Sequence, residues 1–143
     1  MGIIWGLVIA ALALVCWGGQ ALALFAPATA ERFGLADVEA EVDPVYYADG
    51  RGEAFWDTLT LWTLLVAGVL LIFDAAAWPY FGLIGGAMYV YFAGRGVFAR
   101  RAMQRVGQRI GSAATVKTAY AALSIWGVAG LVTMIAAIVA LAD

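Results

Sequence analysis

Histidine is absent from this sequence, and cysteine occurs once, at Cys16. One thiol cannot form an intramolecular disulfide, and a chain without imidazoles has no histidine ligand for zinc or haem. Catalytic triads that use a histidine base are excluded for the same reason. Any catalysis would have to use carboxylates, arginines, tyrosines or a bound cofactor, and the sequence indicates neither a metal site nor a cofactor.

Charged residues are also scarce. They make up 13% of the 143 residues, whereas hydrophobic residues make up 65%. A soluble domain has about a quarter of its residues charged, and a small domain cannot hide this much apolar surface inside itself. The composition therefore predicts that lipid covers much of the protein. The net charge is −2 and no basic domain is present, which excludes nucleic acid as an expected partner.

The chain is organised as four long apolar runs, each long enough to cross a hydrocarbon layer of ~30 Å as a helix. No alternating pattern typical of barrel strands is present. The sequence therefore predicts an all-α, polytopic membrane protein in which residues 1–143 form one four-transmembrane-helix bundle. The expected helices are residues 3–25, 55–73, 78–98 and 118–142, joined by an acidic loop at 26–54 and a basic amphipathic segment at 99–117.

The first apolar run has a second interpretation as a cleaved signal peptide, because the small residues after Phe25 imitate a cleavage site. The run is long for such a peptide and no basic residue precedes it, so we expect it to be retained as a helix. Between the second and third runs, Asp74 to Pro79 form a short polar break. Since proline suits the first turn of a helix, a tight helical hairpin is expected there.

The two larger loops carry opposite charges. The acidic loop contains Glu31, Asp37, Glu39, Glu41, Asp43, Asp49 and Glu53 against only Arg32 and Arg51. The segment after the third run contains Arg100, Arg101, Arg105, Arg109 and Lys117 without any acid. Basic residues near membrane ends are held in the cytoplasm, so this segment is expected on the cytoplasmic side of the cell (inner) membrane. Four crossings then place the acidic loop on the same side and both termini outside.

This arrangement brings two charge patterns to one side of the membrane. Acids alternate with apolar residues over positions 37–43, so in an extended chain they share one face. They are Asp37, Glu39, Glu41 and Asp43. Three arginines recur every four residues and form one stripe on a helix, namely Arg101, Arg105 and Arg109. Either the acids clamp the loop onto the arginine stripe, or the arginines contact anionic lipid headgroups while the acids are solvated.

A second group of charges is expected at the membrane boundary. Glu53 and Asp57 are four residues apart at the start of the second helix and share one helix face. Arg51 precedes them, and Arg95 should lie at a similar depth on the next helix. An Asp57–Arg95 pair would lock these two helices together. The alternatives are charges that snorkel to the interface and a site that handles protons or ions.

Small and aromatic residues indicate where the helices pack. Four glycines mark faces for close helix approach, Gly82 and Gly86 in the third helix and Gly127 and Gly130 in the fourth. These faces serve either packing within the bundle or contact with another subunit. Trp62 and Trp126 lie deeper than the other tryptophans, and they indicate either core packing or an aromatic cleft for a quinone or lipid tail.

Several short motifs lie at the ends of the expected helices: Leu24-Phe25-Ala26-Pro27, Phe33-Gly34-Leu35, Asp49-Gly50-Arg51 and Phe92-Ala93-Gly94-Arg95. With the four spans placed, these motifs make the chain resemble the small DoxX-like integral membrane proteins. The acidic loop and the basic extension depart from the short connections of that family. Some of its members are similar to accessory subunits of respiratory quinone-linked systems. The resemblance therefore implies a supporting role and supplies no catalytic residue.

The function expected from the sequence is that of a non-catalytic accessory or assembly subunit. Its partners would be anionic lipid headgroups and other membrane subunits or further copies of itself. One alternative is an oligomeric carrier of a small solute or ion that acts around Asp57 and Arg95. Another is a protein that binds a lipid or quinone. A membrane enzyme is disfavoured, because no nucleophile is spaced from a base in a catalytic pattern.

Overall fold

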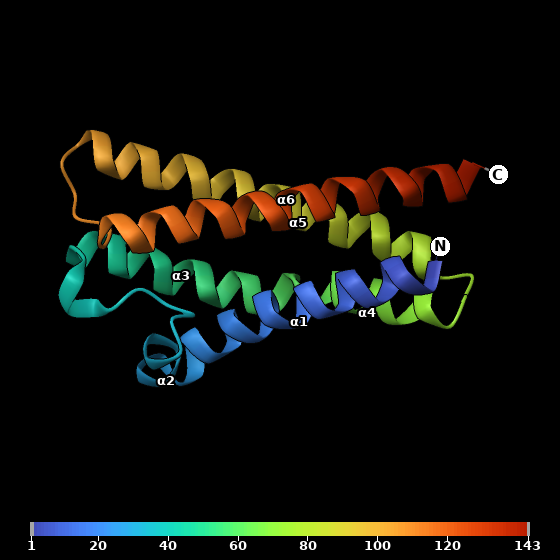
Figure 1. Cartoon of the computed structure of the whole chain (residues 1–143), viewed down its shortest axis with the longest axis horizontal. Coiled ribbons are helices and arrows are strands. Elements are labelled where there is room, and N and C mark those ends of the chain that lie inside the picture. Colours follow the sequence, from blue (N-terminus) through green and yellow to red (C-terminus); the bar gives the residue numbers. More distant parts are fainter. Residues whose placement is uncertain (1, 143) are drawn as a thin grey trace.

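The computed structural model describes residues 2–142, and within them the chain is helical with no strand. The long helices run side by side along the molecule, and both ends of the described chain lie where α4 turns into α5 (Figure 1). The elements are α1 (Gly2–Phe25), α2 (Pro27–Arg32), the 3-10 turn η1 (Glu39–Glu41), α3 (Pro44–Thr60), α4 (Trp62–Ile72), α5 (Trp78–Arg105) and α6 (Ala113–Ala142).

The second apolar stretch differs from the sequence-based expectation, because helix α3 begins at Pro44 rather than near residue 55. Proline fits the first helical turn, and the extended backbone of Asp43 (φ −78°, ψ 147°) leads into it. Leu61 keeps helical angles, and its N–H donates to the Asp57 carbonyl at 2.9 Å, so α3 and α4 form one continuous rod. Hydropathy marked where this rod becomes apolar and missed where it begins.

The remaining connections follow from proline and from positive backbone angles. Asp74 has φ 51° and Pro79 lies in the first turn of α5, which gives the expected tight hairpin between α4 and α5. The basic segment expected at 99–117 is divided. Its first part continues α5 to Arg105, and the chain then turns through Gly107 (φ 80°) and Gly111 (φ 103°) into α6. Glycine is suited to both turn positions because it has no Cβ to clash at positive φ.

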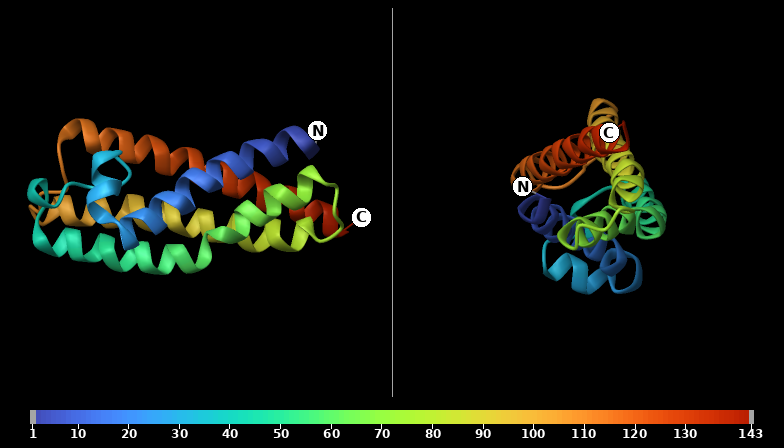
Figure 2. Two further views of the ribbon diagram at one scale, coloured as in Figure 1. Left: turned by 90° about the horizontal axis from the view of Figure 1, so that it is seen from below. Right: turned by 90° about the vertical axis from the view of Figure 1, so that its right-hand side faces the viewer.

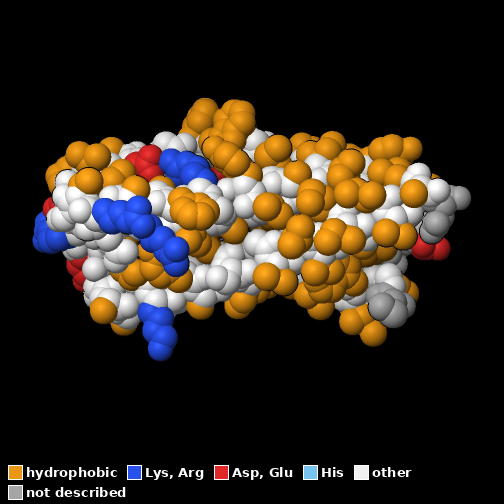
Figure 3. Space-filling view, turned by 90° about the horizontal axis from the view of Figure 1, so that it is seen from above, with side chains coloured by type: hydrophobic (Ala, Val, Ile, Leu, Met, Phe, Trp, Pro, Cys, Tyr) orange, Lys and Arg blue, Asp and Glu red, His pale blue; other side chains and the backbone are white. Residues whose placement is uncertain are grey.

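Three helical stretches among the described residues are long and apolar enough to cross a membrane. They are α1, the rod Pro44–Ile72 and α6. The expected span at 78–98 is helical within α5, but it is not among these three. Its glycines, tyrosines and tryptophan lower its hydropathy. Hydrophobic side chains are spread along the whole length of the face in Figure 3, and most of the charged side chains visible there lie toward one end.

The four glycines expected to mark packing faces lie between α5 and α6 within this chain. A Cβ on Gly86 would be 2.6 Å from the Gly130 carbonyl oxygen, and a Cβ on Gly130 would be 2.8 Å from Tyr89 Cβ. Gly82 faces Ala137 and Gly127 faces Ala93 in the same interface. Because these backbones approach so closely, the glycines are required for packing inside the chain.

Two further interfaces use glycines that the sequence analysis did not single out. A Cβ on Gly6 of α1 would be 2.9 Å from the Gly68 carbonyl oxygen of α4. A Cβ on Gly85 would be 2.6 Å from the backbone nitrogen of Leu64, so α5 also lies tightly on α4. The spacing of Gly2 and Gly6, four residues apart, was the available signal for the first of these contacts.

The α5–α6 contact gives the first prediction. Gly86→Leu should destabilise the folded protein by about 1–3 kcal/mol, because the new side chain forces the two backbones apart. Gly94→Leu is the matched control in the same helix, since a Cβ at Gly94 meets no atom within 4 Å. Unfolding in mixed micelles, followed by circular dichroism, measures both variants. Equal losses would show that the close contact at Gly86 is not what stabilises the pair.

Candidate functional site

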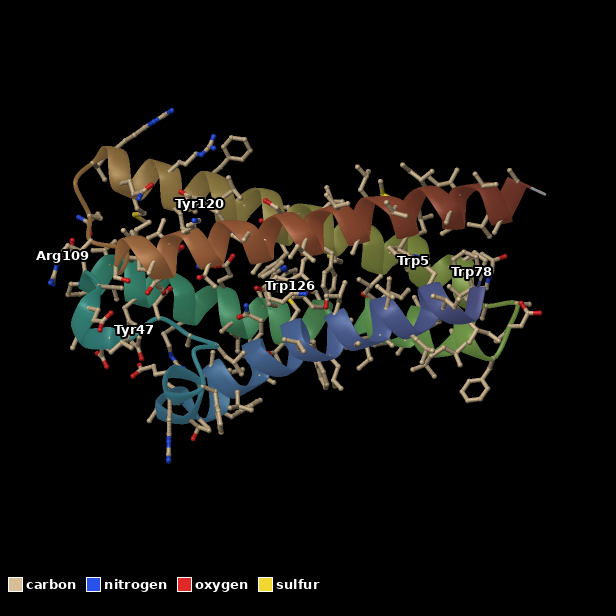
Figure 4. The ribbon with its side chains drawn as sticks, in the orientation of Figure 1. Trp5, Tyr47, Trp78, Arg109, Tyr120 and Trp126 are labelled. Carbon is tan, nitrogen blue, oxygen red and sulfur yellow. The ribbon has the colours of Figure 1, made fainter. Side chains whose placement is uncertain are left out.

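The acidic loop is joined to the turn between α5 and α6 by backbone and side-chain contacts. Val42 and Ile110 form an isolated antiparallel bridge, and both are buried. Beside it, the Asp43 N–H donates to the Arg109 carbonyl at 2.9 Å. Arg109 donates in return from its backbone N–H at 2.7 Å and from Nε at 3.1 Å to the Asp43 carboxylate. We name these mutual contacts the Asp43–Arg109 clasp. Arg109 is labelled in Figure 4 at the end of the molecule where the acidic loop and the α5–α6 turn lie, which we call the loop end.

A second contact holds the same loop to α5. The Tyr46 hydroxyl donates to Asp37 Oδ2 at 2.9 Å, and Arg100 Nη2 lies 3.8 Å from that oxygen. The Arg100 guanidinium also lies over the Tyr46 ring, 5.8 Å from its centroid, as in a cation–π contact. Tyr46 is buried in a small cluster with Val42 and Ile110. The loop therefore has its own apolar core beneath the charges.

The expectation that the acids at positions 37–43 lie along one extended strand is wrong. Glu39 and Glu41 lie in the 3-10 turn η1, so the acids at 37–43 do not share one strand face. Burial of Val42 against Ile110 fixes the local register and brings only Asp43 beside Arg109. Asp37 meets Arg100 instead of the predicted stripe. The remaining predicted residues are exposed and form no ion pair among those found within residues 2–142, namely Glu39, Glu41, Arg101 and Arg105.

The predicted pair between Asp57 and Arg95 is also absent from those ion pairs. Arg95 instead bridges two acids of α3, with Nη2 2.8 Å from Asp49 Oδ1 and Nη1 2.7 Å from Glu53 Oε1. Because α3 starts at Pro44, Asp49 lies on the helix one turn before Glu53. Arg95 therefore reaches toward the loop end of α3. Asp57 lies one helical turn after Glu53 and is not part of this ion pair.

Two other predicted members of this charge group have different surroundings. Asp57 is only 4% exposed, and its Oδ2 has no hydrogen-bond partner within the described residues. Arg51 donates from its guanidinium to the carbonyl oxygens of Ala23 and Leu24 at the end of α1. It thereby supplies hydrogen-bond donors to carbonyls that the helix leaves without partners. Its positive charge also interacts favourably with the negative end of the helix dipole.

A cleft of about 480 Å3 lies between α1 and α6, at the end of the molecule that carries the acidic loop. α1 packs against α3 and α4, and α6 packs against α5, whereas α1 and α6 are not closely packed on each other. The two ribbons cross in the left view of Figure 2, and Figure 1 shows them spreading apart toward the end where α1 leads into α2. Two indole N–H groups bridge the two helices: Trp5 donates to Thr133 Oγ1 at 3.2 Å, and Trp126, which also lines the cleft, donates to the Leu12 carbonyl at 3.0 Å. Both tryptophans lie between α1 and α6 in Figure 4.

The lining of this α1–α6 cleft changes from apolar to charged. Small residues on both helices leave the space open, including Gly19, Ala119 and Ala122. Larger apolar walls come from Val15, Phe92, Leu123 and Trp126. At the loop end the lining includes Gln20 and five charged residues, four of them acids, namely Glu31, Asp37, Glu41, Glu53 and Arg100. Such a cleft is suited to a molecule with an apolar part and a polar end.

Trp126 was predicted from the sequence to lie deep, with a cleft as one of two interpretations, whereas Tyr46, Arg100 and the cleft alanines Ala119 and Ala122 were not predicted as site residues. Arg100 stood in the basic segment but outside the stripe of every fourth residue. The spacing of Asp49, Glu53 and Asp57 would have signalled their shared face, had the helix start at Pro44 been recognised.

No family model, no curated protein and no solved structure matches the chain. The resemblance to the DoxX-like proteins therefore rests on its short motifs, and the site is interpreted from its geometry.

The Asp43–Arg109 clasp gives a prediction about pH. Hydrogen bonds from the Arg109 backbone N–H and side chain hold the pKa of the Asp43 carboxyl below its usual value of about 4. A lowered pKa in the folded state means that the clasp stabilises the loop above the usual pKa. That contribution is lost as the pH falls through the lowered pKa. The NMR resonance of the Arg109 amide should therefore titrate with a midpoint below about 4.

Asp43→Asn is the control for this titration. It removes the ionisable group while keeping a side chain of nearly the same shape, so the Arg109 amide should then show no such transition. A midpoint at or above the usual aspartate value in the unaltered protein would contradict the clasp.

Proposed function

We propose that this chain is an integral membrane protein that crosses the bilayer four times. In this proposal α5 spans the membrane in addition to the three apolar stretches described above. The two ends of the described chain lie at the same end of the molecule, which an even number of crossings requires (Figure 1). α5 has 28 residues and connects the end of α4 to the start of α6. Its glycines face α4 and α6, so this helix is packed between neighbours and needs less apolar surface than a helix surrounded by lipid.

The charges support one orientation in the cell (inner) membrane. The acidic loop and the basic α5–α6 turn lie together, joined by the Asp43–Arg109 clasp. Since basic residues near membrane ends are retained in the cytoplasm, both connections are cytoplasmic in this proposal. The exposed arginines Arg101 and Arg105 are then placed to contact anionic headgroups.

Cysteine labelling tests this orientation. In a Cys16→Ala background, Ala76→Cys should react with a membrane-impermeant maleimide in intact cells, because residue 76 lies in the exposed turn at the opposite end. Glu39→Cys, which is also exposed, should react only after the membrane is permeabilised. The reverse pattern would contradict the orientation, and labelling of both sites in intact cells would contradict the shared side of the loops.

The function that the geometry supports best is the binding of a lipid-soluble amphiphile, a lipid or a quinone, in the α1–α6 cleft. The observation that carries this proposal is the cleft of about 480 Å3 with an apolar wall and a charged end. Because α1 and α6 are not closely packed there, a molecule dissolved in the bilayer can enter sideways between them. Its apolar part would lie along Leu123 and Trp126, with its polar group near Arg100.

The geometry supports ligand binding more directly than it supports a role as an assembly subunit. The subunit interpretation used the glycine faces and the charged cytoplasmic side as contact surfaces. Of these, the glycine faces are occupied, because Gly82, Gly86, Gly127 and Gly130 pack against residues of this same chain. The α1–α6 cleft, by contrast, is a concave site in which apolar walls and a few polar groups converge. We therefore prefer ligand binding over a role as an assembly subunit.

Filling the cleft tests this function. Ala122→Phe places a large side chain in the lining, whereas Ala121→Phe puts the same side chain on the exposed neighbouring face of α6. Native mass spectrometry with an added short-chain quinone, which is uncharged, should detect a one-to-one complex. Ala122→Phe should reduce its retention by about tenfold, equivalent to about 1.4 kcal/mol, and Ala121→Phe should not. Equal retention by both variants would contradict the site.

A further inference from the structure

A second cleft, of about 490 Å3, lies between α3 and α5. Charged residues of both helices line it, namely Asp49, Glu53, Asp57 and Arg95. Aromatic side chains form the rest of its wall, namely Trp56, Tyr91 and Phe92. Trp56 and Tyr91 are more than half exposed, at 55% and 58%, so they flank an open mouth. We name this site the α3–α5 cleft.

The negative charges of this cleft outnumber the positive ones. The three acids are four residues apart along α3 and lie on one helix face. Arg95 is the single basic residue in the lining, and it is already engaged by Asp49 and Glu53. One guanidinium cannot neutralise three carboxylates. The cleft therefore presents an excess of negative charge to whatever enters it.

Asp57 adds a second and independent observation. It is 4% exposed, it lines the cleft, and its Oδ2 has no hydrogen-bond partner within the described residues. Burying a carboxylate without a partner carries a large desolvation cost, so a cation or a proton at this oxygen stabilises the folded protein. No group of three or more acidic or thiol ligands among residues 2–142 is arranged to hold a metal ion.

We propose that the α3–α5 cleft binds an organic ammonium group. Its positive charge would lie between Asp57 and Glu53, and its alkyl surface would contact the rings of Tyr91 and Trp56. Aromatic faces attract ammonium groups through the ring quadrupole, and this attraction strengthens when the cation is desolvated. The ammonium belongs either to a free amine or to the headgroup of a membrane lipid, and both sources share this chemistry.

Tetramethylammonium is the probe for the test. Added to the protein in micelles as its chloride, it should raise the thermal unfolding temperature with saturation, whereas sodium chloride at equal ionic strength should not. Asp57→Asn should weaken the apparent affinity by about tenfold or more. Asp74→Asn is the control, because Asp74 is an exposed acid at the opposite end of the molecule. Absence of saturation, or an unchanged response in Asp57→Asn, would overturn the proposal.

A second pair of variants keeps the test decisive if Asp57→Asn fails to fold. Tyr91→Leu removes an exposed ring from the cleft wall and should weaken tetramethylammonium binding severalfold. Tyr80→Leu removes a similarly exposed ring of α5 that does not line the cleft, and it should have no effect. Equal effects of the two variants would overturn the proposal. Ala122→Phe should leave tetramethylammonium binding unchanged, which separates this site from the α1–α6 cleft.

Lipid nanodiscs distinguish the two sources of the ammonium group. In phosphatidylglycerol, which has no amine, the tetramethylammonium response should persist. If a lipid headgroup is the natural ligand, phosphatidylethanolamine should compete and reduce that response. If a free amine is the ligand, the response should be equal in both lipids. A response in neither lipid would overturn the proposal.

Discussion

Helix α5 contacts α4 and α6 through two adjacent glycines, and the positions of the other helices depend on these contacts. A side chain at Gly85 would collide with the backbone of α4, and one at Gly86 would collide with the backbone of α6. The two neighbours therefore lie close to α5 on either side of it. α1 is then placed through its own contact with α4 at Gly6, so it is not closely packed on α6. The α1–α6 cleft is a consequence of this order of packing.

The tryptophan bridges set the shape of that cleft. Trp5 and Trp126 each place a large ring between α1 and α6 and donate an indole N–H across the gap. An indole is bulky enough to separate two helices, and its N–H needs a partner when it is away from water. The bridges thus hold the helices at a distance while the smaller side chains beyond Trp126 leave the space unfilled. Of the two rings, Trp126 borders the cleft, so this part of its wall is in place before any ligand binds.

Much of the helical pattern could be predicted from the sequence, because apolar runs of this length and the Asp74–Pro79 break leave few alternatives. The start of α3 could not, since hydropathy reports where a helix becomes apolar and not where its hydrogen bonds begin. That error also affected the predicted ion pair. Because residues 44–54 were expected to form a loop, Asp57 was predicted as the partner of Arg95. The Asp43–Arg109 contact belonged to the predicted clamp, but it depends on the bridge between Val42 and Ile110, which no periodicity reveals.

The isolation of Asp57 follows from the register between α3 and α5. Arg95 lies beside the loop end of α3, where two acids satisfy its guanidinium, and a further turn separates Asp57 from that pairing. Neither helix can slide to correct this, because Gly85 fixes α5 against Leu64 in the same rod. Within residues 2–142, no basic side chain forms an ion pair with Asp57, the most buried acid described there. A cation that neutralised this carboxylate would therefore be an added ligand, and the aromatic wall beside it favours a cation with apolar surface over a small hydrated ion.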